Sequence, residues 1–187
     1  MLYPEIVIAG CGNPLFADDG FGPAVVEELK KLQLPDTVKV IDAGLGGPHF
    51  IFTLLDNEVT RQLVIVDIAD FGAEPGKVTR LKYTDLPVGS YRDVHSWDLT
   101  EPLQRLSDRI DITVIGCQPK SVEEFTLGLT DEIKEAVPKA VRIVLEEIGF
   151  DGTTINLQEE GERASEADRN YTLKERGGDG EICNNSL

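Results

Sequence analysis

Apolar and polar positions follow two rhythms along this chain, one typical of strands and one typical of helices. Short apolar runs of strand length alternate with segments whose apolar residues recur at helical spacing. The predicted strands are residues 5–10, 38–42, 63–67, 77–83 and 111–116. The predicted helices are residues 21–34, 50–55 and 99–106, and a last long helix capped by Thr130. This alternation predicts a mostly parallel sheet that is covered on both faces.

Two of these elements have features of their own. The run 77–83 alternates with period two, which favours a half-exposed strand at the edge of the sheet. In the last helix, Asp131 and Glu132 would lie in the first turn, where negative charge suits the helix dipole. Pro138 is expected to bend this helix or to mark its true start.

The composition changes near Phe150. Residues 151–187 contain few large apolar side chains, with 9 acidic and 4 basic residues. A segment of this kind buries too little apolar surface to offset the entropy lost on ordering. The sequence therefore predicts one α/β domain over residues 1–150 and an acidic, disordered tail over residues 151–187.

Charge and cysteine usage exclude several classes of function. The net charge of the 187 residues is −16, which disfavours nucleic acid and anionic membranes as partners. No apolar run has the length of a membrane helix, and the N-terminus lacks the layout of a signal peptide. The three cysteines are odd in number and form no CxxC pair. We therefore expect reduced thiols and a cytoplasmic location.

Candidate chemistry gathers where the predicted strands end. Asp19 follows the first strand, Asp67 closes the third, and His95 lies in a polar loop. In an open parallel sheet, strand C-termini and the loops after them converge on one edge, where ligands bind. Two carboxylates and an imidazole that met there would form a metal site with open positions. Two of them have a plainer interpretation: Asp19 beside Asp18 suits a helix start, and a loop histidine such as His95 is usually solvated, whereas a carboxylate at the strand end of Asp67 is seldom needed for folding.

A nucleotide site is the competing interpretation of the same edge. Gly10-Cys11-Gly12 follows the first strand, and Asp42 ends the second, as in dinucleotide-binding folds. However, Leu15 occupies the place of the third glycine. The neighbouring carboxylates at positions 18 and 19 would also repel a pyrophosphate at the helix start.

The remaining thiols and histidine have ordinary explanations. A cysteine nucleophile, Cys11 or Cys117, acting with His95 is conceivable, but small buried thiols are commoner. His49 is expected to cap or flank the helix that follows it. No GxSxG, HExxH or Walker motif occurs in the sequence.

The opening motif resembles that of a known family. Residues 10–22, GCGNPLFADDGFG, are similar to the G-x-G-N-x-L-x-x-D-[DE]-G-x-G opening of the hydrogenase maturation proteases. Shorter pieces agree with the same family in the same order. They are Asp42-Ala43-Gly44, Val64 to Asp67, Asp93-Val94-His95, Gly116 to Ser121, and Gly128-Leu129-Thr130. Residues 44–55 most resemble the archaeal subgroup that is paired with the coenzyme F420-reducing hydrogenase.

This resemblance implies a fold and an activity. The fold would be a three-layer α/β/α sandwich with a twisted, mostly parallel sheet, as in phosphorylase/hydrolase-like folds. The activity would be one endoproteolytic cut, of aspartic type, that removes the C-terminal extension of a [NiFe] hydrogenase large-subunit precursor after nickel insertion. The precursor's own nickel would be the recognition tag, and no organic cofactor is expected.

The resemblance also assigns roles to residues. Asp19, Asp67 and His95 would be both the nickel ligands and the catalytic residues, with Asp19 or Asp18 available as general base. Position 19 is Asp where some relatives have Glu, and Ala-Gly-Leu-Gly-Gly follows Asp42 where the family has Gly-Gly-Thr. A non-catalytic nickel-sensing maturation chaperone on the same fold is the main alternative, and a nucleotide-binding enzyme is the third.

Overall fold

The structure is a computed structural model that describes residues 3–44, 51, 55–56, 58–82, 107–123 and 125–150. The chain divides into the units Met1–Phe150 and Asp151–Leu187, and every described residue belongs to the first. The predicted disordered tail therefore lies outside the described residues and stays a prediction. The predicted helix 99–106 also lies outside them, as does the predicted helix 50–55 apart from Ile51 and Leu55.

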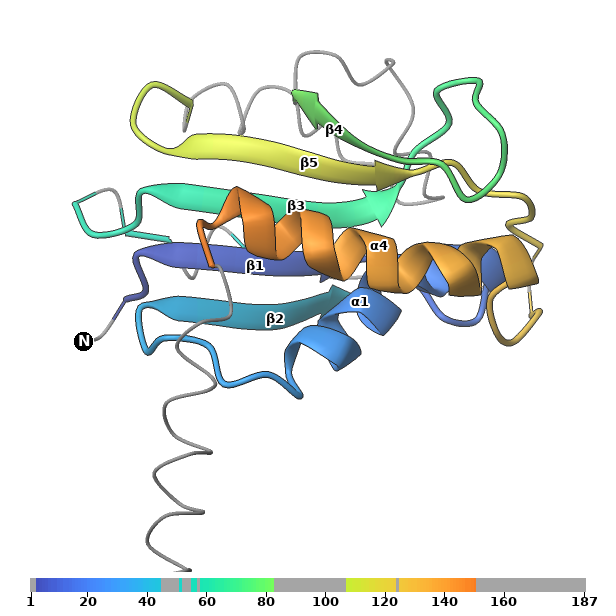
Figure 1. Cartoon of the computed structure of the whole chain (residues 1–187), viewed down its shortest axis with the longest axis horizontal. Coiled ribbons are helices and arrows are strands. Elements are labelled where there is room, and N and C mark those ends of the chain that lie inside the picture. Colours follow the sequence, from blue (N-terminus) through green and yellow to red (C-terminus); the bar gives the residue numbers. More distant parts are fainter. Residues whose placement is uncertain are drawn as a thin grey trace, which may run out of the picture. The chain divides into compact units, whose positions relative to one another are not determined.

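A five-stranded sheet forms the centre of the described part of the chain (Figure 1). Its strands are β1 (Ile6–Cys11), β2 (Val38–Gly44), β3 (Gln62–Ile68), β4 (Val78–Lys82) and β5 (Asp111–Cys117). The spatial order is β2-β1-β3-β5-β4. All neighbouring pairs are parallel except β4 and β5, which run antiparallel at the edge. The predicted mostly parallel sheet and its half-exposed edge strand are thus confirmed.

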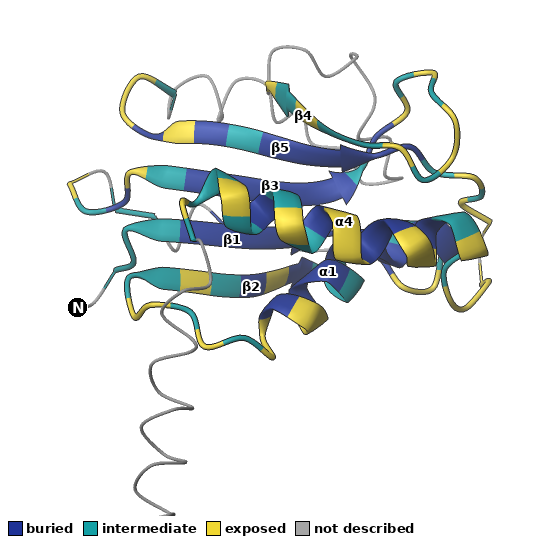
Figure 2. Cartoon of the chain, viewed as in Figure 1, coloured by how far each residue is buried: buried dark blue, intermediate teal, exposed yellow. Residues whose placement is uncertain are grey.

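Two helices cover one face of this sheet. A short 3₁₀ helix, η1 (Ala17–Gly20), leads into α1 (Phe21–Leu29), and α4 (Asp131–Glu147) packs beside α1 (Figure 1). Their apolar sides meet buried residues of β1, β3 and β5 such as Ile8, Val64 and Ile115. Figure 2 shows the result, with β1, β3 and β5 buried along most of their length, β2 and β4 mostly intermediate or exposed, and α4 exposed on its outer side.

The opposite face of the sheet has a core of its own. Val7, Ala9, Leu63, Ile65 and Val114 are buried there, and Ile51 and Leu55 pack against them. An apolar core on both faces is what the predicted α/β class requires.

Two helix boundaries differ from the predictions. The first helix ends at Leu29 rather than at Leu34, and Pro35 accounts only for the exclusion of Leu34, since the residue before a proline avoids helical geometry. Leu32 still packs against the core from the turn that follows. The last helix starts at Asp131, so Pro138 lies inside it and does not mark its start. Within the described residues, no helix has the length and apolarity needed to cross a membrane.

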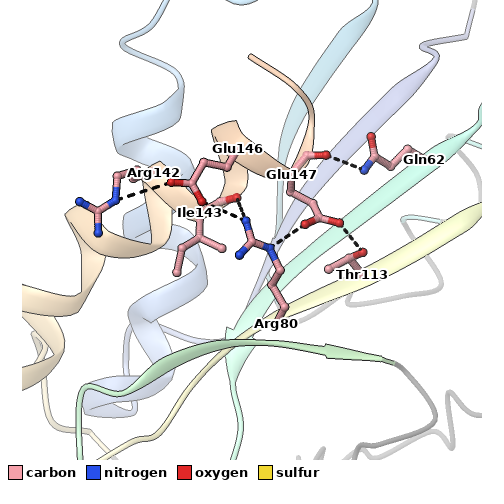
Figure 3. A network of polar contacts seen from close by, with 7 residues as sticks. All are labelled: Gln62, Arg80, Thr113, Arg142, Ile143, Glu146 and Glu147. Carbon is pink, nitrogen blue, oxygen red and sulfur yellow. Dashed lines mark hydrogen bonds and ion pairs between the residues drawn. The ribbon is translucent and has the colours of Figure 1, made fainter. Parts of the chain in front are cut away.

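A polar network fastens the end of α4 to the sheet (Figure 3). The Arg80 guanidinium of β4 bonds Glu147 at 2.8 Å and Glu146 at 3.1 Å, and the Thr113 hydroxyl of β5 donates to Glu147 at 2.8 Å. Gln62 of β3 donates to the Glu147 carbonyl at 3.1 Å. The network therefore connects three strands to one helix end.

Arg80→Ala is expected to destabilise the protein modestly. The Arg80 side chain is 45% exposed, so solvent screening limits the contribution of its ion pairs to about 0.5–1 kcal/mol. Urea unfolding measures this loss, with Arg142→Ala as the control, because Arg142 is 3.9 Å from Glu146 and is 73% exposed. Equal losses for both variants would show that the network contributes nothing beyond a surface charge.

Candidate functional site

The glycines of the opening motif let α1 approach β1 closely. A Cβ added to Gly10 would lie 2.4 Å from the Gly22 carbonyl oxygen, and one added to Gly22 would lie 2.1 Å from the Cys11 carbonyl oxygen. Distances this short leave no room for any side chain. The motif therefore places the start of α1 directly against the C-terminal end of β1.

Gly12 has a different task, because it forms the turn that positions Asp19. Its φ is +120°, and an added Cβ would lie 2.0 Å from the Asp19 carbonyl oxygen. The Asn13 backbone N–H donates to Asp19 Oδ2 at 2.7 Å, which orients the carboxylate. The Asp19 backbone thus fills the space beside the glycine turn that a pyrophosphate would need, which argues against the nucleotide alternative.

Asp67 is held on the neighbouring strand, β3, one residue before the strand ends. Alternation along the strand places its side chain on the face of Leu63 and Ile65, away from α1 and α4. The side chain is only 5% exposed, and its Oδ1 accepts the Ile68 N–H at 2.7 Å. Burial raises the pKa of Asp67 well above 3.8, and the negative charge of Asp19 raises it further.

Two of the three predicted site residues, Asp19 and Asp67, lie among the described residues. Burial is the main cause of the raised pKa of Asp67 and the negative charge of Asp19 is the second, so the two carboxylates lie near enough to interact at the C-terminal edge of the sheet. His95 and His49 lie outside the described residues. Within the described ranges, no group of three His, Cys, Asp or Glu side chains could hold a metal ion. The three-ligand site stays a prediction.

Asp18 has a role that differs from the predicted one. It is fully buried and accepts backbone N–H bonds from Lys120 (2.9 Å), Ser121 (2.8 Å) and Thr130 (2.7 Å), and a hydroxyl bond from Thr130 at 3.1 Å. Four donors occupy its oxygens, and no face is open to a water. Asp18 is thus unsuited to act as a general base and instead fixes the loop after β5 and the start of α4.

Both described thiols are poor nucleophiles. Burial, followed by the charges of Asp67, Asp42 and Asp19, raises the pKa of Cys11 well above 9.0. Burial is also the main cause that raises the pKa of Cys117 to about 12. Attack requires the thiolate, which is scarce at such pKa values. The interpretation of these cysteines as small buried thiols fits this environment.

The Asp42 side chain lies on the opposite face of the sheet from the Asp67 side chain. Its neighbours Ile41 and Ala43 pack on the core beside Asp67, so the Asp42 side chain points to the α1 side and is exposed. There it lines an open hollow of about 490 Å³ with Pro23, Glu27 and Lys30. Its Oδ1 accepts the Gly44 N–H at 2.9 Å, which shapes the end of β2.

Comparison with known proteins identifies relatives of the whole domain. The family model described as hydrogenase maturation protease matches residues 23–147. Coenzyme F420 hydrogenase subunit delta of Methanothermobacter thermautotrophicus is 46% identical over 151 residues, covering 78% of this chain and 95% of the relative. This identity confirms the predicted relationship to the F420-associated archaeal subgroup.

Solved structures agree. The hydrogenase 2 maturation peptidase from Thaumarchaeota archaeon SCGC_AB-539-E09 matches with a TM-score of 0.59 at 30% identity, over 79% of this chain and 99% of that chain. The [NiFe] hydrogenase maturation protease HycI from Thermococcus kodakarensis KOD1 matches with a TM-score of 0.62 at 27% identity, over 76% and 90% of the two chains. The chain belongs to the hydrogenase maturation protease family.

Proposed function

We propose that this peptidase removes the C-terminal extension of a [NiFe] hydrogenase large-subunit precursor and that it recognises the nickel already inserted there. The relative with 46% identity favours a coenzyme F420-reducing hydrogenase as the partner. The observation that carries the recognition step is the placement of Asp19 and Asp67 at one sheet edge, with Asp67 buried. His95 is proposed as the third ligand.

The electrostatics of the pair support a role with a divalent cation. Ionising Asp67 inside the protein carries a desolvation cost, and the charge of Asp19 adds to that cost. A bound cation would reverse this balance by favouring both ionised carboxylates. Carboxylate and imidazole ligands suit nickel and leave positions for ligands from the precursor. Nickel is substrate here, since it arrives with the precursor.

The proposed chemistry is hydrolysis by water. Water adds to the scissile carbonyl carbon, the C–N bond breaks, and the departing amine takes a proton. The precursor's nickel can polarise the carbonyl or lower the pKa of a bound water. Asp19, which is half-buried rather than sealed as Asp18 is, is the candidate general base. The enzyme is aspartic in type in this sense, because aspartates and no thiol support the attack.

One incubation tests the proposal. The purified chain is mixed with nickel-loaded precursor of a coenzyme F420-reducing hydrogenase, and the precursor mass is followed. Shortening of the loaded precursor, with none of the nickel-free precursor, is the expected result. Binding without shortening would support the nickel-sensing chaperone instead, and equal cleavage of both precursors would refute recognition of nickel.

Cys11→Ser and Cys117→Ser are expected to retain processing within about threefold of wild type, because neither thiol is ionised near neutral pH. Cleavage rates are compared by mass spectrometry, and circular dichroism confirms that each variant is folded. Loss of cleavage in a folded cysteine variant would favour a thiol nucleophile.

A further inference from the structure

Large apolar side chains are exposed in the segment before η1 and in the loop between β5 and α4. Leu15 is 48% exposed, Phe125 82% and Leu127 77%. Among the described residues, only Val122 joins them as a large hydrophobic residue with comparable exposure. All four belong to two segments, the opening motif and the loop between β5 and α4. Exposed apolar groups that gather in one place commonly mark a binding surface.

Backbone hydrogen bonds connect the two segments directly. Phe16 and Thr126 form a parallel β-bridge, and the Ala17 N–H donates to the Thr126 carbonyl at 2.7 Å. The rings of Phe16 and Phe125 lie 6.4 Å apart, tilted by 30°. We name Leu15, Phe16, Phe125 and Leu127 the apolar patch.

The backbone at Phe125 is costly for the residue that occupies it. Its φ is +56°, in the left-handed region that large side chains rarely adopt. A side chain that is 82% exposed regains little of this cost through burial. Glycine or asparagine would suit the position better as far as folding is concerned. Strain of this kind is retained where the strained group serves function.

We infer that the apolar patch binds an apolar segment of the hydrogenase large-subunit precursor beside the scissile bond. The inference rests on the proposed function. Leu15 and Phe16 directly precede η1, which contains Asp19, so a segment bound on the patch would lie close to that carboxylate. Binding at the patch would supply affinity for the precursor that does not depend on nickel, while Asp19 and Asp67 would recognise the nickel itself.

Charge argues for the precursor over the other possible occupants. A second copy of this chain would bring a net charge of −16 against an equally acidic surface. Residues 151–187 carry 9 acidic and 4 basic residues, so this segment would also be repelled. An apolar segment that lacks negative charge meets no such repulsion.

Two substitutions test the patch. Phe125→Asn relieves the backbone strain, and Leu127→Asp adds charge at a side chain that is 77% exposed. Each is expected to raise the KM for nickel-loaded precursor by about 10- to 30-fold with kcat little changed, as for loss of an apolar anchor. The melting temperature should be unchanged or, for Phe125→Asn, higher. Gln33→Asp, an exposed site beyond the other end of α1, adds the same charge as a control.

The measurements separate this inference from the proposed function. Precursor binding is followed by fluorescence anisotropy alongside cleavage. If the wild type cleaves the precursor and both variants have the KM of the wild type, the patch does not bind the precursor, and the proposed protease function still stands. If the wild type binds the precursor without cleaving it and both variants lose that binding, the patch is supported and the protease function is refuted. A wild-type dimer in sedimentation that Phe125→Asn dissociates with KM unaffected would reassign the patch to contacts between copies.

Discussion

Asp67→Asn is expected to abolish precursor processing while raising the melting temperature at neutral pH. Asparagine keeps the shape and the acceptor for the Ile68 N–H, which bonds Asp67 Oδ1 at 2.7 Å. It removes a carboxylate that burial and Asp19 make costly to ionise. The folded protein therefore gains stability as it loses the charge that would bind a dication.

The expected loss of processing exceeds about 100-fold, since even the partners behind a metal ligand commonly contribute 10- to 100-fold. His95→Ala should cause a similar loss, because it removes the proposed nitrogen ligand. Asp19→Glu should be the mildest change at the site, since it keeps the charge and only lengthens the arm. Cleavage of nickel-loaded precursor and thermal melts measured on the same preparations provide both readouts.

Asp42→Asn is the matched control. Asp42 also ends a strand at this edge but faces the α1 side, and asparagine can still accept the Gly44 N–H. Its processing should match wild type. Full activity in Asp67→Asn, or equal losses in both variants, would contradict a specific role for the buried carboxylate.

The same carboxylate gives the stability a pH dependence whose sign follows from its raised pKa. Between the ordinary value of 3.8 and the raised value, the folded protein holds a proton that the unfolded chain releases. The contribution of Asp67 to the free energy of unfolding is thus complete below the ordinary pKa and is lost as pH rises through the raised pKa. Melting temperatures measured from about pH 4 to about pH 8 should show that Asp67→Asn gains most at the upper end. A gain that is largest at low pH would refute this.

Processing should respond to pH in the opposite direction. Nickel requires the ionised carboxylate, so the affinity for nickel-bearing precursor should fall as pH falls through the raised pKa of Asp67. The two profiles together distinguish a metal ligand from a residue that is only structural, since a structural residue has no reason to couple acid pH to precursor affinity.

The centre of the sheet was predictable from local pattern because β1, β3 and β5 are buried along most of their length. Residues 63–67 and 111–116 are nearly continuous apolar runs, and both form central strands of the sheet. The end of α1 was less predictable. Leu32 keeps the helical spacing of apolar residues after the helix has ended, so periodicity alone extends the helix too far.

The placement of Asp19 and Asp67 at one edge of the sheet was predictable because parallel strands send their C-terminal ends to one edge. The role of Asp18 was not, because its partners are backbone N–H groups at positions 120, 121 and 130. A bond from a backbone N–H cannot be predicted from the residue type, because every residue except proline has this donor. The motif matches at 116–121 and 128–130 are the available signal, and Asp18 is the physical link between those two segments and the opening motif.

Asp18→Ala is expected to destabilise the protein by roughly 3–5 kcal/mol, a much larger loss of stability than Arg80→Ala should cause. Alanine would leave three backbone N–H groups and the Thr130 hydroxyl without an acceptor at a site that is fully buried. The melting temperature should drop by about 10 °C. Differential scanning calorimetry measures this drop directly.

Asp131→Ala provides the comparison, since Asp131 is also an aspartate near the start of α4 but its side chain is 92% exposed. It should melt close to wild type. The Asp18 variant should also lose precursor binding at temperatures where it remains folded, because the bonds from Asp18 to Ser121 and Thr130 hold the segment of Phe125 and Leu127 beside η1. A folded Asp18→Ala that melts like wild type would show that the four bonds are replaceable by water. The hydrogen bonds that Asp18 accepts would then contribute neither to the stability of the fold nor to the surface that binds the precursor.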